Sequence, residues 1–180
     1  MPSDMDWDLK GFFMLLEQSG ISVWVRESPS LLAFPTVISL HVVGMGLVAG
    51  GNAAMDLRIL GFAQGIPISS LERFVPVIRF GFWLNAISGL LLLLAYPTKA
   101  LTNPVFYLKL LFIALALVDT LLIRKQIIYK AVAPDTSVAT KGKILAAVSL
   151  ALWAGAIISG RLLAYTYHYL NSSFDSRRGY

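Results

Sequence analysis

The uncharged apolar stretch Leu31–Gly51 constrains the fold of this chain more than any other part of its sequence. It reads LLAFPTVISLHVVGMGLVAGG, which is 21 residues without Asp, Glu, Lys or Arg. A helix that crosses the hydrocarbon of a bilayer needs about 20 mostly apolar residues. The stretch therefore predicts a membrane-spanning helix over 31–51, followed by the more polar segment NAAMDLRILGFA.

Three further stretches are apolar and long enough to span a membrane. They cover 74–96, which precedes Pro97, then 105–123, which follows Asn103-Pro104, and 144–163. The whole chain is 57% hydrophobic and 14% charged, a composition typical of membrane proteins. Short connections favour antiparallel neighbours. We therefore predict an all-α integral membrane protein in which residues 31–170 form a four-helix antiparallel bundle, followed by a tail at 171–180.

Residues 1–30 predict a separate amphipathic segment. Asp4, Asp6 and Asp8 occupy the place of the basic region of a signal peptide, so we expect no cleavable signal. Apolar residues then recur at helical spacing until Gly20, which we expect to end a helix. This pattern suits a helix in the periplasmic membrane interface, and it suits equally a helix packed on the bundle. The apolar positions are Leu9, Phe12, Phe13, Leu15 and Leu16.

The distribution of basic residues predicts the orientation of the bundle. Loops rich in Lys and Arg remain on the cytoplasmic side of a membrane. The connection between the second and third spans contains only Lys99, whereas five basic residues lie between the third and fourth. We therefore predict a multi-pass protein of the bacterial cytoplasmic (inner) membrane with both termini periplasmic, and the net charge of +5 does not imply a nucleic-acid partner. The five residues are Arg124, Lys125, Lys130, Lys141 and Lys143.

His41 lies in the middle of the first span and is one of two histidines in the chain. A polar side chain at membrane depth is costly unless it has a partner, so His41 is a candidate functional residue. Close to it, Gly46-x-x-x-Gly50 places two small residues on one helix face, where a neighbouring helix could approach.

Four charged residues near the cytoplasmic ends of the spans predict a structural charge network. Arg79 and Asp119 lie at matching depths, each about 8 Å from its helix end, and form the natural ion pair. Asp56 and Arg58 lie near the same level. A clamp between helix ends explains these residues better than a proton relay, because no second feature supports a relay.

The periplasmic half of the bundle combines His41 with two cations, Lys109 and Arg161. No buried carboxylate lies at that level to balance them, so a bound anion would explain the set. Haem b fits this pattern, with its iron on His41 and its propionates on Arg161 and Lys109. Alternatively, both cations reach headgroups or backbone carbonyls, and His41 bonds between helices. His168 lies too far along the bundle normal, about 13 Å, to be the second axial ligand.

Two other functions stay open at this stage. His41 and Met45 lie one turn apart, and imidazole with thioether suits Cu(I), so copper is the alternative cofactor. A cofactor-free scaffold subunit of a larger membrane complex is the third hypothesis. The sequence contains no recognisable catalytic motif and no cysteine, which excludes iron–sulfur clusters and thiolate metal sites. A redox or accessory subunit with a membrane or periplasmic partner is therefore favoured over a stand-alone enzyme, and homo-oligomerisation is left open.

Several short motifs resemble an uncharacterised family of small bacterial four-helix inner-membrane proteins, a domain of unknown function. The resemblance covers nearly the whole chain. The chain is also similar, more distantly, to copper-resistance protein D. The resemblance implies the fold and the inner-membrane location but no activity. The matching residues are His41-x-x-Gly44 with Gly50, Asp56-x-Arg58-x-x-Gly61, Asn103-Pro104-x-Phe106-x-x-Lys109, and Trp153 with Gly160-Arg161-x-x-Ala164.

Overall fold

The computed structural model describes residues 11, 15–30, 33–125 and 140–176. Within them the chain is all-α, and four helices are long and apolar enough to cross a membrane, which confirms the predicted four-helix bundle. Each predicted span lies within or beside one of these four helices. The elements are α2 (Gly20–Glu27), α3 (Phe34–Leu60), η1 (Ile68–Arg73), α4 (Phe74–Ala95), α5 (Pro97–Leu101), α6 (Pro104–Ile123) and α7 (Thr140–Ser176).

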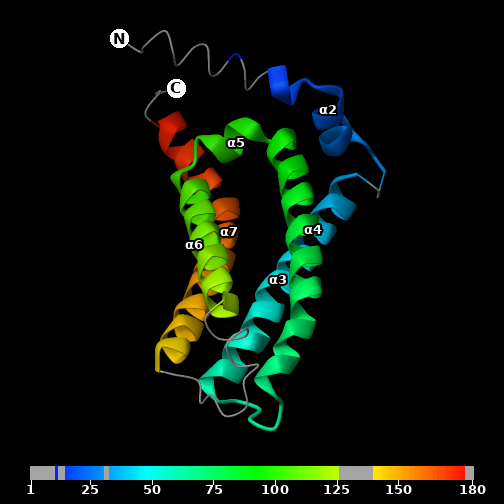
Figure 1. Ribbon diagram of the computed structural model, residues 1–180. Coiled ribbons are helices and arrows are strands. Elements are labelled where there is room, and N and C mark those ends of the chain that lie inside the picture. The colour runs from blue at the N-terminus through cyan, green and yellow to red at the C-terminus, as the bar shows by residue number, and fades with distance from the viewer. Residues whose placement is uncertain (1–10, 12–14, 31–32, 126–139, 177–180) are drawn as a thin grey trace.

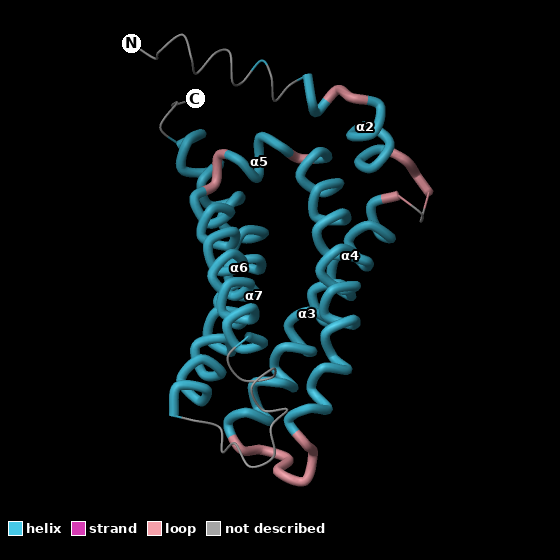
Figure 2. The backbone as a smooth tube through the Cα atoms, viewed as in Figure 1, coloured by secondary structure: helices cyan, strands magenta, loops and turns pink. Residues whose placement is uncertain are grey.

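The four long helices form two antiparallel pairs (Figure 1). α3 packs along α4, α6 packs along α7, and α3 also crosses α7. The short helix α5 bridges α4 and α6 at one end of the bundle, here called the α5 end, where α2 and the last turns of α7 also lie. The opposite end, which contains η1, is called the η1 end. The described loops between neighbouring helices, drawn in pink, are short (Figure 2).

Capping residues set the helix ends that the sequence marks. Pro104 is the first residue of α6, and the Asn103 side chain accepts a hydrogen bond from Val105 N at 3.0 Å. α3 ends at Gly61, whose φ of 110° is left-handed and therefore favours glycine. α3 continues to Leu60, well past the predicted limit at residue 51, because NAAMDLRIL contains no helix-breaking residue.

Glycines allow α3 and α4 to approach until their backbones touch. A Cβ atom added to Gly44 would lie 2.6 Å from the backbone nitrogen of Asn85, and one added to Gly81 would lie 3.0 Å from the carbonyl oxygen of Gly44. Gly46 and Gly50, which the sequence predicted at a helix contact, have no atom within 4 Å of an added Cβ. That prediction is wrong, because positions 46 and 50 lie on a face of α3 that is turned away from α4.

The apolar core lies mainly toward the η1 end, where α3, α6 and α7 meet. Small residues, Ala116 and Ala146, are fully buried there and bring these helices together. Large apolar side chains elsewhere on the long helices face outward, as lipid contact requires; among the exposed ones are Val42, Phe80, Trp83, Leu111 and Leu121.

Near the N-terminus, residues 1–10 and 12–14 of the predicted amphipathic helix lie outside the described residues. Residues 15–17 are helical, and α2 then begins at Gly20, where the sequence predicted only a helix end. Ser19 caps α2, and the buried hydroxyl of Ser22 donates to the carbonyl of Ala95 at 3.4 Å. α2, a helix that the sequence did not predict, is therefore packed on α4.

The glycine contacts give a matched pair of substitutions. Gly44→Ala places a methyl group against the backbone of α4 and is expected to lower the free energy of unfolding by about 1–3 kcal/mol. Gly46→Ala meets open space and should be neutral or stabilise the helix by up to about 1 kcal/mol. Thermal unfolding of both purified variants in detergent micelles measures the difference, and equal stabilities would contradict the helix contact described here.

Candidate functional site

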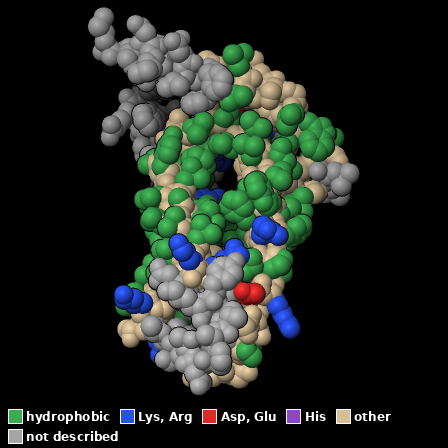
Figure 3. Space-filling view, in the orientation of Figure 1, with side chains coloured by type: hydrophobic (Ala, Val, Ile, Leu, Met, Phe, Trp, Pro, Cys, Tyr) green, Lys and Arg blue, Asp and Glu red, His purple; other side chains and the backbone are tan. Residues whose placement is uncertain are grey.

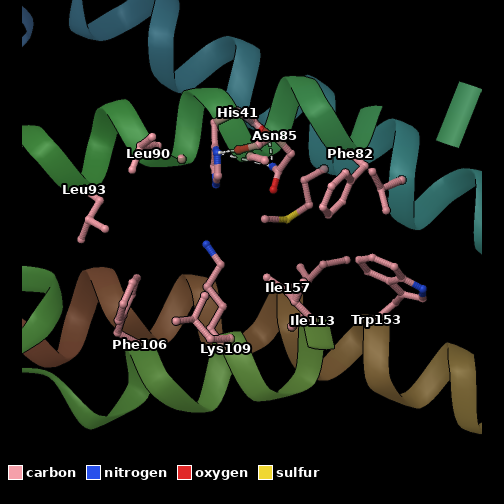
Figure 4. A pocket seen from close by; sticks show the side chains of 16 residues that line it. His41, Phe82, Asn85, Leu90, Leu93, Phe106, Lys109, Ile113, Trp153 and Ile157 are labelled. Carbon is pink, nitrogen blue, oxygen red and sulfur yellow. Dashed lines mark hydrogen bonds between the residues drawn. The ribbon is translucent and has the colours of Figure 1, made fainter. Parts of the chain in front are cut away.

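A cavity of about 290 Å³ lies between the two helix pairs, toward the α5 end. Figure 3 shows the hollow on the face drawn, with basic side chains inside it. All four long helices line it, and α4 and α6 make no extensive contact across it. Its polar groups come from His41, Asn85 and Lys109, and Met45 contributes a thioether. The large apolar wall residues include Phe82, Leu90, Leu93, Phe106, Ile113 and Trp153 (Figure 4).

The imidazole of His41 is held through one ring nitrogen. Nδ1 lies 3.1 Å from the backbone carbonyl oxygen of Asn85 and 3.2 Å from the hydroxyl oxygen of Ser88. The Asn85 amide donates to the carbonyl of His41 at 2.7 Å. These contacts attach the middle of α3 to α4 and fix the direction of the ring.

The acceptors around Nδ1 determine the tautomer of His41. A carbonyl oxygen only accepts, and the Ser88 hydroxyl uses its hydrogen on the carbonyl of Leu84 at 2.6 Å. The Asn85 amide nitrogen also lies 3.4 Å from Nδ1, but it already donates to the carbonyl of His41 at 2.7 Å. We therefore infer that Nδ1 carries the ring proton and donates it to the carbonyl of Asn85. Nε2 has no hydrogen bond among the described residues, so its lone pair is open toward the cavity. An imidazole with Nδ1–H on a carbonyl and Nε2 free is in the state that binds a metal.

Gly89 makes room for this imidazole. A Cβ atom at position 89 would lie 2.9 Å from Cε1 and 3.3 Å from Nδ1 of His41. Because the ring also touches Asn85 and Ser88, an added methyl group at position 89 would displace it from its hydrogen bonds. Gly89 is therefore part of the site, and the sequence analysis did not identify it.

Lys109 faces His41 from the opposite wall (Figure 4). Its side chain passes Gly160, and its ammonium group has no hydrogen bond or ion pair among the described residues. Each group lies about 8–10 Å from the start of its helix, so the two residues lie at similar depths along the bundle.

The structure brings together three of the predicted site residues, His41, Met45 and Lys109, and separates Arg161 from them. Arg161 is exposed on α7 and does not line the cavity. It lies one position after Gly160, about 100° around the helix, so its side chain points elsewhere. The side chain of His168 lies outside the described residues.

A second group of polar side chains, here called the polar layer, lies in the bundle interior toward the η1 end. The Thr120 hydroxyl lies 2.9 Å from Oδ1 of Asn52 and 2.8 Å from the carbonyl of Ala116, and the Asn52 amide donates to the carbonyl of Val48 at 2.8 Å. Both side chains are buried. This pair links α3 to α6 in the bundle interior.

The acidic residues of this layer do not form the predicted charge network. Among the described residues no ion pair joins Asp119 to Arg79, which is exposed on α4, a helix without extensive contact to α6. Arg58 binds the carbonyls of Gln64 and Ile66 in the following loop. Asp119 instead interacts electrostatically with Asp56, a second carboxylate. The predicted pair is therefore wrong, because matching depth along the normal does not place two helices side by side.

Sequence reasoning identified His41 but missed the residues that orient it. Asn85 and Ser88 stand three positions apart in an otherwise apolar span, and that spacing puts both on one helix face. Polar residues at such spacing in a membrane helix usually bond to a neighbouring helix, so the signal was present in the sequence. Ser149, in the last span, gives a weaker signal of a polar contact between helices, because a lone serine in a span commonly bonds its own backbone.

No family model, curated protein or solved structure matches the chain. In the described part of the chain, no group of three or more His, Asp or Glu side chains is placed to hold a metal ion. A metal at His41 would therefore need ligands from a cofactor or from other side-chain types, such as the thioether of Met45.

The contact between Asn52 and Thr120 allows a matched stability test. Thr120→Val keeps the shape of the side chain but leaves the buried Asn52 oxygen without its donor, and it should destabilise the fold by about 1–3 kcal/mol. Thr102→Val removes a hydroxyl that bonds only the carbonyl of Thr98 in an exposed turn, so it should cost less than about 0.5 kcal/mol. Thermal unfolding of both variants checks the prediction, and an equal loss would show that Thr120 makes no significant bond to α3.

Proposed function

We propose that this multi-pass membrane protein is a haem-b-binding electron-transfer subunit whose cofactor lies between the two helix pairs. It would pass electrons between the quinone pool, or a membrane partner, and a periplasmic protein. The observation that carries the proposal is the open Nε2 lone pair of His41, presented to an apolar cavity with Nδ1 bonded to the carbonyl of Asn85. An imidazole held in this way is a suitable axial ligand, and haem supplies one-electron chemistry when bound.

Some of the remaining residues of the cavity also fit haem b. Aromatic and aliphatic side chains such as Phe82, Phe106 and Trp153 suit a porphyrin face. Lys109 provides the positive charge that a propionate requires, whereas Arg161 lies outside the cavity and has no role in this proposal. A ligand larger than the cavity of about 290 Å³ would need α4 and α6 to move apart, and the two helices make no extensive contact that opposes this movement.

Copper handling is the second candidate, supported by Met45 on the same cavity wall as His41. An imidazole nitrogen and a thioether sulfur form a soft donor pair that suits Cu(I). The two residues are one turn apart on α3. A cofactor-free scaffold subunit is the remaining alternative.

An absorption spectrum and the metal content of the purified protein test the haem proposal. The wild type should show a Soret band that His41→Ala abolishes, because the axial ligand is lost. Gly89→Ala should also reduce haem retention by displacing the imidazole, and Lys109→Gln should weaken retention without changing the axial ligand. His168→Ala is the matched histidine control and should keep most of the band.

Other outcomes of this experiment favour the alternatives. A wild type that lacks a Soret band and loses bound Cu(I) in both His41→Ala and Met45→Leu supports copper handling. A colourless, metal-free protein contradicts both cofactors and leaves the scaffold hypothesis. A Soret band that persists in His41→Ala overturns the assignment of the axial ligand.

We also propose an inner-membrane location with both termini periplasmic. The η1 end contains most of the described basic residues, which the positive-inside rule assigns to the cytoplasm. They are Arg58, Arg73, Arg79, Arg124, Lys125, Lys141 and Lys143. α2 and the last turns of α7 lie together at the other end.

Reporter fusions test this orientation. A reporter inserted in the segment 126–139 is expected to be active in the cytoplasm, and reporters fused before residue 1 or after residue 180 should be active in the periplasm. Neutralising Lys141 and Lys143 should weaken the preference for this orientation, since fewer positive charges then remain at the η1 end. A periplasmic signal from the insertion at 126–139 would reverse the orientation without affecting the cavity.

A further inference from the structure

Two carboxylates meet in the bundle interior without a counter-ion. Asp56 on α3 is fully buried, Asp119 on α6 is 6% exposed, and the two interact electrostatically. Both oxygens of Asp56 and Oδ2 of Asp119 are buried without a hydrogen-bond partner in the part of the chain that the structure describes. Among the described residues no cationic side chain forms an ion pair with either one. Such a pair is strongly unfavourable in a membrane interior unless positive charge balances it.

The surrounding polar residues show that this layer is otherwise well satisfied. Asn52, one turn before Asp56, and Thr120, next to Asp119, bond each other and the backbone. Among the described residues of this layer, the buried polar atoms without a partner belong to the two carboxylates and to Ser149 on α7.

Ser149, on a third helix, is a second sign that something binds beside Asp56. Its side chain is fully buried on α7, and its hydroxyl oxygen has no hydrogen-bond partner among the residues described. The hydroxyl is close enough to interact with the Asp56 carboxylate, although the geometry is not that of a hydrogen bond. A hydroxyl oxygen that is buried beside a carboxylate, without a hydrogen bond between them, suits a ligand that contacts both the hydroxyl and the carboxylate.

We propose that Asp56, Asp119 and Ser149 form a binding site for a small hard metal cation at the η1 end of the bundle. Carboxylate and hydroxyl oxygens are the donors that Na⁺, Mg²⁺ and Ca²⁺ take, and water completes their coordination. The three side chains come from α3, α6 and α7, so a bound cation would join three of the helices that contribute to the apolar core.

This site is separate from the cavity around His41. Asp56 and Asp119 each lie four residues from the η1 end of their helices, about 6 Å along the axis, which places the cation near the surface that we assign to the cytoplasm. Its ligands are hard oxygens, whereas the cavity offers an imidazole nitrogen, a thioether and an ammonium group. The cation proposal therefore stands or fails independently of haem or copper.

Thermal unfolding of the full-length protein in detergent micelles tests the cation site. NaCl, MgCl₂ and CaCl₂ are titrated separately into chelator-treated protein, with choline chloride keeping the ionic strength constant. At least one metal should raise Tm in a saturable manner, because a ligand that binds only the folded state stabilises it by mass action. The cation that acts at the lowest concentration identifies the occupant.

Variants distinguish the proposed site from surface binding. Asp56→Asn and Asp119→Asn should abolish the metal-dependent rise in Tm, and in metal-free buffer each should melt at or above the wild-type temperature because an unbalanced charge has been removed. Ser149→Ala keeps both carboxylates and should weaken the apparent affinity by about tenfold or more. Glu72→Gln, an exposed acid on η1, is the matched control and should respond as the wild type does.

Three outcomes overturn the proposal. The first is a wild-type Tm that depends only on ionic strength. The second is an equal metal response in Asp56→Asn and wild type. The third is an unchanged apparent metal affinity in Ser149→Ala, and this variant decides the question if either Asn variant fails to fold.

Discussion

Backbone contact between α3 and α4 at Gly44 and Gly81 is the interaction on which the rest of the structure depends. The absence of side chains at these positions sets both the distance and the register of the two helices. With that register fixed, His41 meets Asn85 and Ser88, and Gly89 leaves the space that the imidazole occupies. A membrane interior provides no hydrophobic force between helices, so such close packing must supply much of the association.

The two ends of the bundle differ in how closely the helix pairs pack. Toward the η1 end, α3 reaches α7, and fully buried alanines allow these helices and α6 to close around a core. Toward the α5 end, the two helix pairs stand apart, and α5 bridges α4 and α6 above the cavity. Trp153 lies between these regions. Its ring lines the cavity, while its indole N–H points away from His41 and has no partner within the described ranges.

The sequence was sufficient to predict the spans, because length and apolarity alone decide whether a segment can cross a bilayer. It also indicated the Asn103-Pro104 start of α6, and it singled out His41, which bonds to α4. It failed where the outcome depends on which helices are neighbours. Arg79 and Asp119 share a depth but not an interface, and Gly46 has the spacing of a contact residue on the wrong face of its helix. The α5 turn and the packing of α2 were missed because both depend on tertiary contacts such as that of Ser22 with Ala95.

The gap between α4 and α6 also determines from where a molecule reaches the cavity. The exposed residues along this gap, including Leu90 and Leu110, are apolar and line the cavity while facing the surrounding hydrocarbon. A molecule that enters here comes from the lipid phase and moves sideways in the plane of the membrane. Its supply then depends on how strongly it partitions into the bilayer, so a sparingly water-soluble compound can be abundant at the entrance while being scarce in the surrounding water.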